Sequence, residues 1–209
     1  MRPRALTLLV ALFIALGLVA APAANASTGG TVDTKNQYSN VGLILFYADD
    51  GGRYRCSATL VSPTVLLTAA HCTLGTVGKT LVNFDPIIAE QAPAPFPVAA
   101  DPSKGYTSAE ITKSGSYAGT AYTHPEYSDF TDLDNWNDVG VIVLDKAIKG
   151  VKTSPIAGLG TLDEIVYSDL SKTLFRAVGY GTEVRKAEEG PQKPTPMTYP
   201  LARRYVDMP

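Results

Sequence analysis

Positive charge is not in excess in this sequence, and that limits its partners. The 209 residues include 18 Lys and Arg against 20 Asp and Glu, which gives a formal net charge of −2. The basic residues are scattered along the chain rather than clustered. Because binding to nucleic acid depends on a basic surface that neutralises phosphates, we expect no nucleic-acid partner.

Long apolar runs are equally scarce, and the one that occurs lies at the N-terminus. The run from Leu6 to Ala21 follows two arginines and ends just before Ala24-Asn25-Ala26, an A-x-A motif. This order is typical of a secretory signal peptide that is cleaved after Ala26. A membrane anchor is the alternative, but the run is short and the cleavage motif is well formed.

This leader divides the chain. We expect residues 1–26 to be a signal peptide and residues 27–40 to form a polar N-terminal lead of the mature protein. No later stretch is long and apolar enough to cross a bilayer. The mature protein is therefore expected to be secreted, extracellular and without membrane attachment.

Cysteine is rare as well, since the sequence has only Cys56 and Cys72. An even pair in a chain exported to an oxidising compartment predicts a disulfide, with two free thiols as the alternative. Such a bridge stabilises a fold by about 3 kcal/mol in the chain-entropy description. A metal site is not expected, because two Cys and two His at these spacings do not form a usual ligand set.

Amphipathic helix patterns are missing after the leader, whereas turn residues are common, with 18 Gly and 15 Pro. Short apolar or alternating runs between turn signals predict strands, and the most apolar, Val41–Tyr47, is expected to be buried on both faces. Further strands are expected at Tyr54–Val61, Val65–Thr68, Lys79–Phe84, Val139–Leu144, Leu174–Gly179 and Leu201–Met208. This pattern predicts an all-β antiparallel barrel or sandwich.

The intervals between these strands are interpreted from their turn residues. Asp49–Gly52 predicts a hairpin turn. The Ala- and Pro-rich stretch Pro86–Gly105 predicts a surface loop, and Glu183–Pro200 predicts an exposed connection. We expect a further strand pair within Ala109–Thr123, around its glycines.

Histidine occurs only twice, as His71 and His124. His71 lies in LTAAHC, between small residues and a cysteine that we expect to be bridged. In a secreted all-β protein, this context suggests a nucleophile–His–carboxylate system, in which the base must be held in one tautomer. A histidine with only a structural role is the alternative. His124 precedes Pro125, and we expect it to shape a turn.

Three motifs occur in a fixed order along the chain. CSATLVSPTVLLTAAHC spans Cys56–Cys72, HPEY at His124–Tyr127 is followed by NDVGVIVL at Asn137–Leu144, and AVGYG spans Ala177–Gly181. Together they resemble the motifs of the trypsin-like (chymotrypsin-fold) serine proteases. The resemblance covers about residues 41–181.

The resemblance implies an antiparallel double β-barrel and a secreted endopeptidase that acts on proteins or peptides. In that family the histidine of TAAHC, here His71, is the general base, and the aspartate matched by Asp138 orients it. The cysteines matched by Cys56 and Cys72 are paired. We expect a monomer with no cofactor and no metal ion.

The nucleophile of that family is not found. Its serine lies in Gly-Asp-Ser-Gly-Gly after the aspartate, whereas Ser154, Ser168 and Ser171 lie outside any Gly-rich turn. The segment around Ser116 (GSYAG) precedes Asp138 and is out of register with G-x-S-x-G. With neither nucleophile nor oxyanion hole, the chain as written is expected to be inactive.

The chain differs from the trypsin-like family in two further respects. The trypsin-like domain, residues 41–209, is expected to hold most of the first barrel and an incomplete second one, with exposed strand edges and poor stability. The stretch Leu201–Met208 is expected to be a strand without partners. The Ile-Val-Gly-Gly start of many relatives is absent before Val41, so activation through a new amino group is in doubt.

An acidic cluster suggests calcium, but its spacing argues against it. Asp129, Asp132 and Asp134 lie close together. Asn137 stands where an EF-hand loop needs Gly, and Val143 stands where the bidentate Glu belongs. We interpret the segment as a solvated loop.

Three interpretations of function remain open. The first is a trypsin-like endopeptidase whose remaining portion lies outside these 209 residues. The second is a non-catalytic protease homologue that acts as a secreted binding protein. The third is an unrelated β-barrel binding module, which the three motifs disfavour.

Overall fold

The computed structural model describes residues 30–129, 131–132, 134–165, 169, 172–181, 195–196 and 199–208. The expected signal peptide, Ser168, Ser171 and most of the expected connection Glu183–Pro200 lie outside the described residues. None of the described helices is long and apolar enough to span a membrane.

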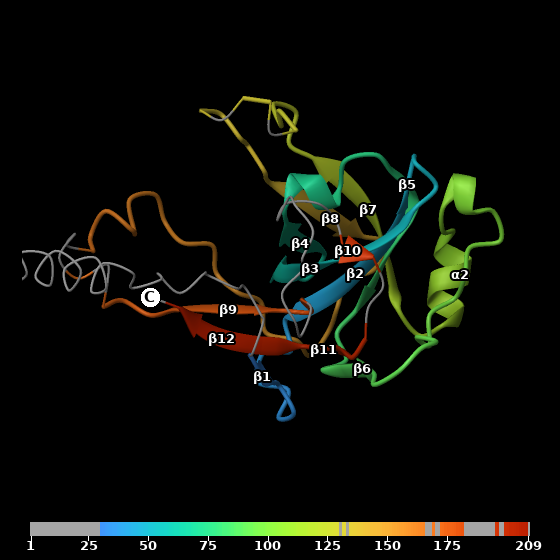
Figure 1. Cartoon of the computed structure of the whole chain (residues 1–209), viewed down its shortest axis with the longest axis horizontal. Coiled ribbons are helices and arrows are strands. Elements are labelled where there is room, and N and C mark those ends of the chain that lie inside the picture. Colours follow the sequence, from blue (N-terminus) through green and yellow to red (C-terminus); the bar gives the residue numbers. More distant parts are fainter. Residues whose placement is uncertain are drawn as a thin grey trace, which may run out of the picture.

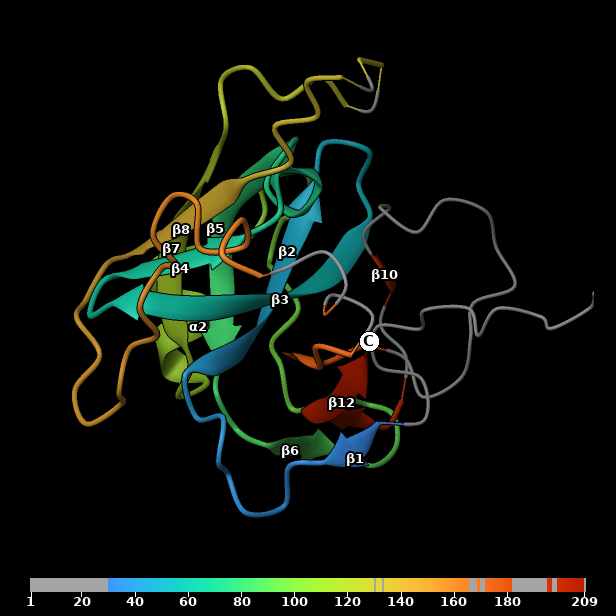
Figure 2. The same cartoon turned by 90° about the vertical axis from the view of Figure 1, so that its left-hand side faces the viewer.

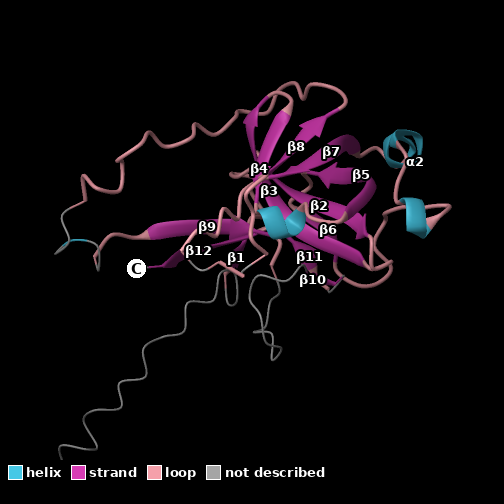
Figure 3. Ribbon diagram, turned by 90° about the horizontal axis from the view of Figure 1, so that it is seen from above, coloured by secondary structure: helices cyan, strands magenta, loops and turns pink. Residues whose placement is uncertain are grey.

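Six antiparallel strands close into a barrel (Figures 1 and 3). They are β2 (Val41–Ala48), β3 (Arg53–Ser62), β4 (Val65–Thr68), β5 (Thr76–Asn83), β7 (Tyr117–Thr123) and β8 (Gly140–Leu144). The order is β3-β2-β5-β7-β8-β4, and β4 pairs back with β3. Closure gives each of these strands a partner on both sides, which removes free edges from the barrel. The strands expected at Val41–Tyr47, Tyr54–Val61, Val65–Thr68, Lys79–Phe84 and Val139–Leu144 are confirmed.

Strand β2 is buried on both faces, as its apolar sequence predicts. Ile44 and Phe46 belong to a cluster contributed by β2, β3, β4, β5 and β8, which fills the inside of the barrel. Leu43 and Leu45 belong to a second cluster on the other face of the strand. Both faces of the strand are therefore in contact with a core, which explains the uninterrupted apolar run. The tight turn before β3 contains Gly51 with a φ of 79°.

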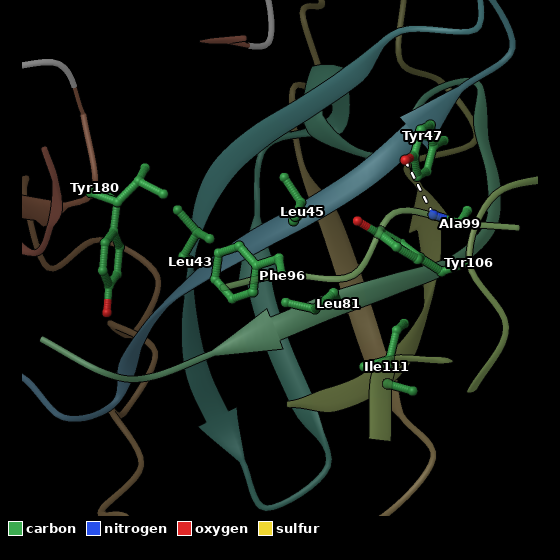
Figure 4. Close-up of a cluster of buried hydrophobic side chains, with 11 residues drawn as sticks. Leu43, Leu45, Tyr47, Leu81, Phe96, Ala99, Tyr106, Ile111 and Tyr180 are labelled. Carbon is green, nitrogen blue, oxygen red and sulfur yellow. Dashed lines mark hydrogen bonds between the residues drawn. The ribbon is translucent and has the colours of Figure 1, made fainter. Parts of the chain in front are cut away.

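The second cluster lies outside the barrel and corrects one prediction (Figure 4). The stretch Pro86–Gly105 is not simply a surface loop, because Phe96 and Ala99 are buried against β2 and β5. The backbone N–H of Ala99 donates to Tyr47 Oη at 3.3 Å. The stretch also holds β6 (Ile87–Ala89) and η2 (Pro102–Lys104). An apolar outer strand face requires such a cover.

A short helix replaces one expected strand. Helix α2 (Ser108–Lys113) occupies the first half of Ala109–Thr123, and only the second half is strand, as β7. The helix begins with a capping box, in which Thr107 Oγ1 accepts from Glu110 N and the Glu110 carboxylate accepts from Thr107 N. Ile111 is fully buried against the barrel. The T-x-x-E signal was present in the sequence, and tertiary packing stabilises a helix too short to persist alone.

The C-terminal segment has partners, contrary to prediction. Strand β12 (Arg204–Met208) lies between β1 (Thr31–Val32) and β9 (Phe175–Gly179) in a three-stranded sheet (Figures 1 and 2). Strand β11 (Leu201–Ala202) pairs with β6, and β10 (Thr195–Pro196) pairs with β3. The expected exposed connection is therefore anchored near its end. These partners are remote in sequence, so local patterns could not reveal them.

Candidate active site

His71 lies three residues after strand β4, in the short 3-10 helix η1 (Ala70–Cys72). Its neighbours Ala70 and Cys72 are buried, and the turn closes through Thr73 N donating to Ala70 O at 2.8 Å. The small residues that precede His71 let the turn sit against the barrel. The His71 side chain itself is 18% exposed, so it lies at the surface of the barrel while its backbone is fixed.

The predicted disulfide between Cys56 and Cys72 is confirmed, with a Cα–Cα distance of 6.2 Å. Cys56 lies in β3, so the bridge joins the histidine turn to a barrel strand. The alternative of two free thiols is therefore wrong. A potential ligand atom of His71 lies within 4.8 Å of both sulfurs. The bond between the sulfurs removes the thiolates that a metal ion would need.

Asp138 lies two residues before β8 and faces His71 through three contacts. His71 Nδ1 lies 2.9 Å from Oδ2 and 3.1 Å from Oδ1, and the backbone N–H of His71 donates to Oδ1 at 2.9 Å. The preceding residue, Asn137, has a φ of 48°, in the left-handed region that Asn tolerates. The structure thus brings together the two residues that the sequence analysis singled out.

This geometry determines how the ring can work. An ionised carboxylate only accepts hydrogen bonds, so its contact with Nδ1 holds the proton of a neutral imidazole on that nitrogen. Nε2 is then the basic nitrogen. The Asp138 side chain is 20% exposed, and the bonds from His71 compensate its partial burial.

Gly140 lets β8 approach the histidine turn. A Cβ at this position would lie 2.8 Å from Ala69 O, closer than real Cβ contacts allow. Gly140 also pairs with Thr68 at the end of β4. The sequence analysis missed Gly140, although a glycine two residues after the aspartate was a usable signal.

Ser57, which sequence reasoning did not single out, positions the AVGYG motif next to the disulfide-bonded Cys56. Its hydroxyl accepts from Tyr180 N at 2.8 Å, and a Cβ on Gly179 would lie 2.7 Å from its Oγ. Arg55 Nη1 donates to Tyr180 O on the same strand edge. The AVGYG motif therefore packs on β3 beside Cys56.

Tyr127 lies near two carboxylates, one of which is Asp138. Burial raises the pKa of Tyr127, and the nearby carboxylates of Asp129 and Asp138 raise it further. Tyr127 Oη donates to Asp129 Oδ1 at 3.2 Å. Asp132 is exposed and accepts from Asn135 Nδ2 at 3.1 Å, which lowers the pKa of its carboxyl group.

The other residues weighed from the sequence have contacts of their own. His124 shapes a turn as predicted, since its Nδ1 accepts from Glu126 N at 3.2 Å and its carbonyl accepts from Tyr127 N at 3.0 Å. Ser154 Oγ accepts from Asn40 Nδ2 at 2.5 Å. Ser116 is buried beside Ser114.

Comparison with known proteins shows the fold. No family model and no curated protein sequence matches this chain. A solved structure of HL collagenase matches with a TM-score of 0.54 and 13% identity, over 86% of this chain and 61% of that one. A solved structure of GrC matches with a TM-score of 0.53 and 18% identity, over 86% of this chain and 63% of that one. This chain thus spans about three fifths of these proteins, and it has the antiparallel β-barrel fold of chymotrypsin-like serine proteases.

Proposed function

We propose that this protein is a secreted serine-type endopeptidase in which His71 is the general base and Asp138 orients it. The proposal rests on the contacts that the Asp138 carboxylate makes with both the ring nitrogen and the backbone N–H of His71. Oδ2 lies 2.9 Å from Nδ1, while Oδ1 accepts from the His71 N–H at 2.9 Å. A histidine with only a structural role does not need a carboxylate that fixes both its ring and its backbone.

The chemistry follows from the tautomer. A serine Oγ that attacks a peptide carbonyl carbon gives its proton to His71 Nε2 as the new C–O bond forms. Asp138 stabilises the resulting imidazolium through Nδ1–H. When the C–N bond breaks, Nε2 returns the proton to the leaving amine. The substrates are proteins or peptides, and the enzyme acts outside the cell as a monomer.

No serine after Asp138 lies in a Gly-rich turn, so this proposal places the nucleophile outside these 209 residues. The 209-residue product is then inactive. Loss of a triad member leaves about 10³–10⁴-fold acceleration over water, and even that depends on an oxyanion hole. Hydrolysis of a peptide ester by the purified chain, blocked by a serine-directed inhibitor, contradicts this part of the proposal.

The decisive experiment compares this chain with a product whose reading frame continues beyond the codon for Pro209. A fluorophosphonate probe should label the longer product at a serine in Gly-Asp-Ser-Gly-Gly, and should not label the 209-residue chain. In the longer product, His71→Ala should abolish labelling, whereas the control His124→Ala should retain it. Labelling that survives His71→Ala overturns the assigned role of His71.

A non-catalytic protease homologue is the second candidate. It is favoured by the same absence of a suitably placed serine in the sequence. If a stop codon follows Pro209 in the source gene, the dyad is a remnant and the secreted protein acts by binding. Capture of a protein partner that also binds the His71→Ala variant supports this alternative.

A further inference from the structure

A fully buried ion pair connects the two ends of the described chain. Arg203 Nε donates to Asp33 Oδ2 at 2.9 Å, and both side chains are 0% exposed. Asp33 lies in the N-terminal lead just after β1, and Arg203 lies between β11 and β12. A charge in such a place is tolerated only when its partner and its hydrogen bonds are complete.

The remaining donors of Arg203 reach other parts of the molecule. Nη1 donates to Val41 O at 2.9 Å and to Phe84 O at 3.0 Å, both on the barrel side. It also donates to Tyr180 Oη at 3.2 Å, directly after β9, and Nη2 donates to Asn36 Oδ1 in the lead. One guanidinium therefore joins the lead, the barrel and the C-terminal sheet.

Both carboxylate oxygens of Asp33 also accept hydrogen bonds from the backbone. Its Oδ1 accepts from Gln37 N at 2.8 Å, and its Oδ2 accepts from Tyr38 N at 3.0 Å. These bonds fold the lead into a turn around the carboxylate. Removal of the segment would leave the Arg203 guanidinium buried without a counter-charge.

A second anchor lies four residues after the predicted signal-peptide cut. Gly30 is buried, and its carbonyl accepts from Arg204 Nη1 at 3.1 Å. Thr31 and Val32 then pair with Tyr205 and Arg204 in the sheet. The lead is thus held by consecutive arginines from Gly30 onward.

We propose that N-terminal processing of this protein ends between Ala26 and Gly30, and that residues 30–40 remain in the mature protein as a strap between the barrel and the C-terminal sheet. Only Ser27, Thr28 and Gly29 separate the predicted cut from the first buried anchor. No propeptide longer than Ser27–Gly29 then precedes the mature N-terminus, and no later cut within residues 30–40 activates the protein. The inference uses the predicted signal peptide and is independent of the catalytic role of His71.

The direct test is the N-terminus of the protein secreted with its own leader, read by Edman sequencing and intact mass. The proposal requires a first residue from 27 to 30. Any other first residue, whether Met1 or a residue after Gly30, overturns it.

The strap is tested by Asp33→Asn with Lys35→Ala as the matched control, since Lys35 is an exposed residue of the same lead. Asn keeps the shape of the side chain but removes the counter-charge of Arg203. The melting temperature should fall by about 10 °C in Asp33→Asn and stay unchanged in the control. Failure of Asp33→Asn to accumulate, with normal secretion of Lys35→Ala, counts as the same result. An unchanged melting temperature in Asp33→Asn overturns the strap.

Discussion

Gly140 lies so close to Thr73 that a Cβ added to the glycine would stand 2.7 Å from Thr73 Oγ1. The Thr73 hydroxyl is fixed there by Ala70 O and Thr123 Oγ1. Gly140→Ala must therefore push β8 away from the histidine turn, and we expect a loss of about 1–3 kcal/mol from overpacking.

Urea unfolding checks that loss, and the NMR signal of the His71 ring reports the separation of His71 from Asp138. Gly158→Ala is the control, because the nearest atom to its added Cβ lies 3.7 Å away. Equal unfolding midpoints for the two variants would show that the close contact is not required.

Asp138→Asn should reverse the tautomer of His71. An amide NH₂ turned toward Nδ1 donates to that nitrogen, which moves the ring proton to Nε2. Nitrogen-15 chemical shifts of the ring measure the change directly, without any need for activity. Asp129→Asn, on the same loop, should leave the ring signals as they are. An Nδ1–H tautomer that persists in Asp138→Asn contradicts the assigned orienting role.

The Cys56–Cys72 bridge should contribute measurably to stability. The two residues are separated by 16 positions, and a loop of that size corresponds to about 3 kcal/mol in the chain-entropy description. Replacement of both cysteines by serine should lower the free energy of unfolding by about that amount. Dithiothreitol should destabilise the native protein but leave the double variant unaffected. A double variant as stable as the native protein argues against this estimate.

Acid should weaken the fold through Asp33. Burial opposes ionisation of this carboxyl group, but the N–H groups of Gln37 and Tyr38 and the Arg203 guanidinium outweigh it and lower its pKa from the ordinary value of 3.8. A lowered folded-state pKa stabilises the protein fully above the unfolded-state value. That stabilisation disappears as pH falls below about 3.8 through the folded-state pKa.

Melting temperatures from pH 6 to pH 2 measure this effect. The difference between native protein and Asp33→Asn should be largest near pH 6 and should shrink at the acid end. If the difference in melting temperature stays constant from pH 6 to pH 2, the substitution does not act through the charge of Asp33.

Phe96 should be the main element of the cover over the outer face of β2. It is 9% exposed and packs in the outer cluster, so Phe96→Ala should cost about 3–5 kcal/mol. Val98, two residues away, is 68% exposed, and Val98→Ala should change stability by no more than about 0.5 kcal/mol. Chemical denaturation compares the two. If both variants lose only a little stability, the stretch Pro86–Gly105 is a surface loop, as the sequence predicted.

Local sequence patterns predicted β2, β3, β4, β5 and β8, and the family resemblance pointed to His71 and Asp138, which are in contact. The apolar composition of Val41–Tyr47 and Val65–Thr68 is enough to predict that these strands are buried. His71 and Asp138 lie in short motifs that are visible in the sequence. Segments whose order comes from distant contacts were not predictable in this way. Phe96 is buried only because β2 has a second apolar face, and Leu201–Met208 is paired only because β1, β6 and β9 lie beside it. Helix α2 carried a capping signal, but its length gave no helical periodicity.

The ion pair between Asp33 and Arg203 also sets a time order for folding. The two residues are 170 positions apart, and ribosomes add about 5–20 residues per second. Arg203 is therefore synthesised about 9–34 s after Asp33. Until then Asp33 lacks its counter-charge, so the strap closes only after Arg203 has been synthesised.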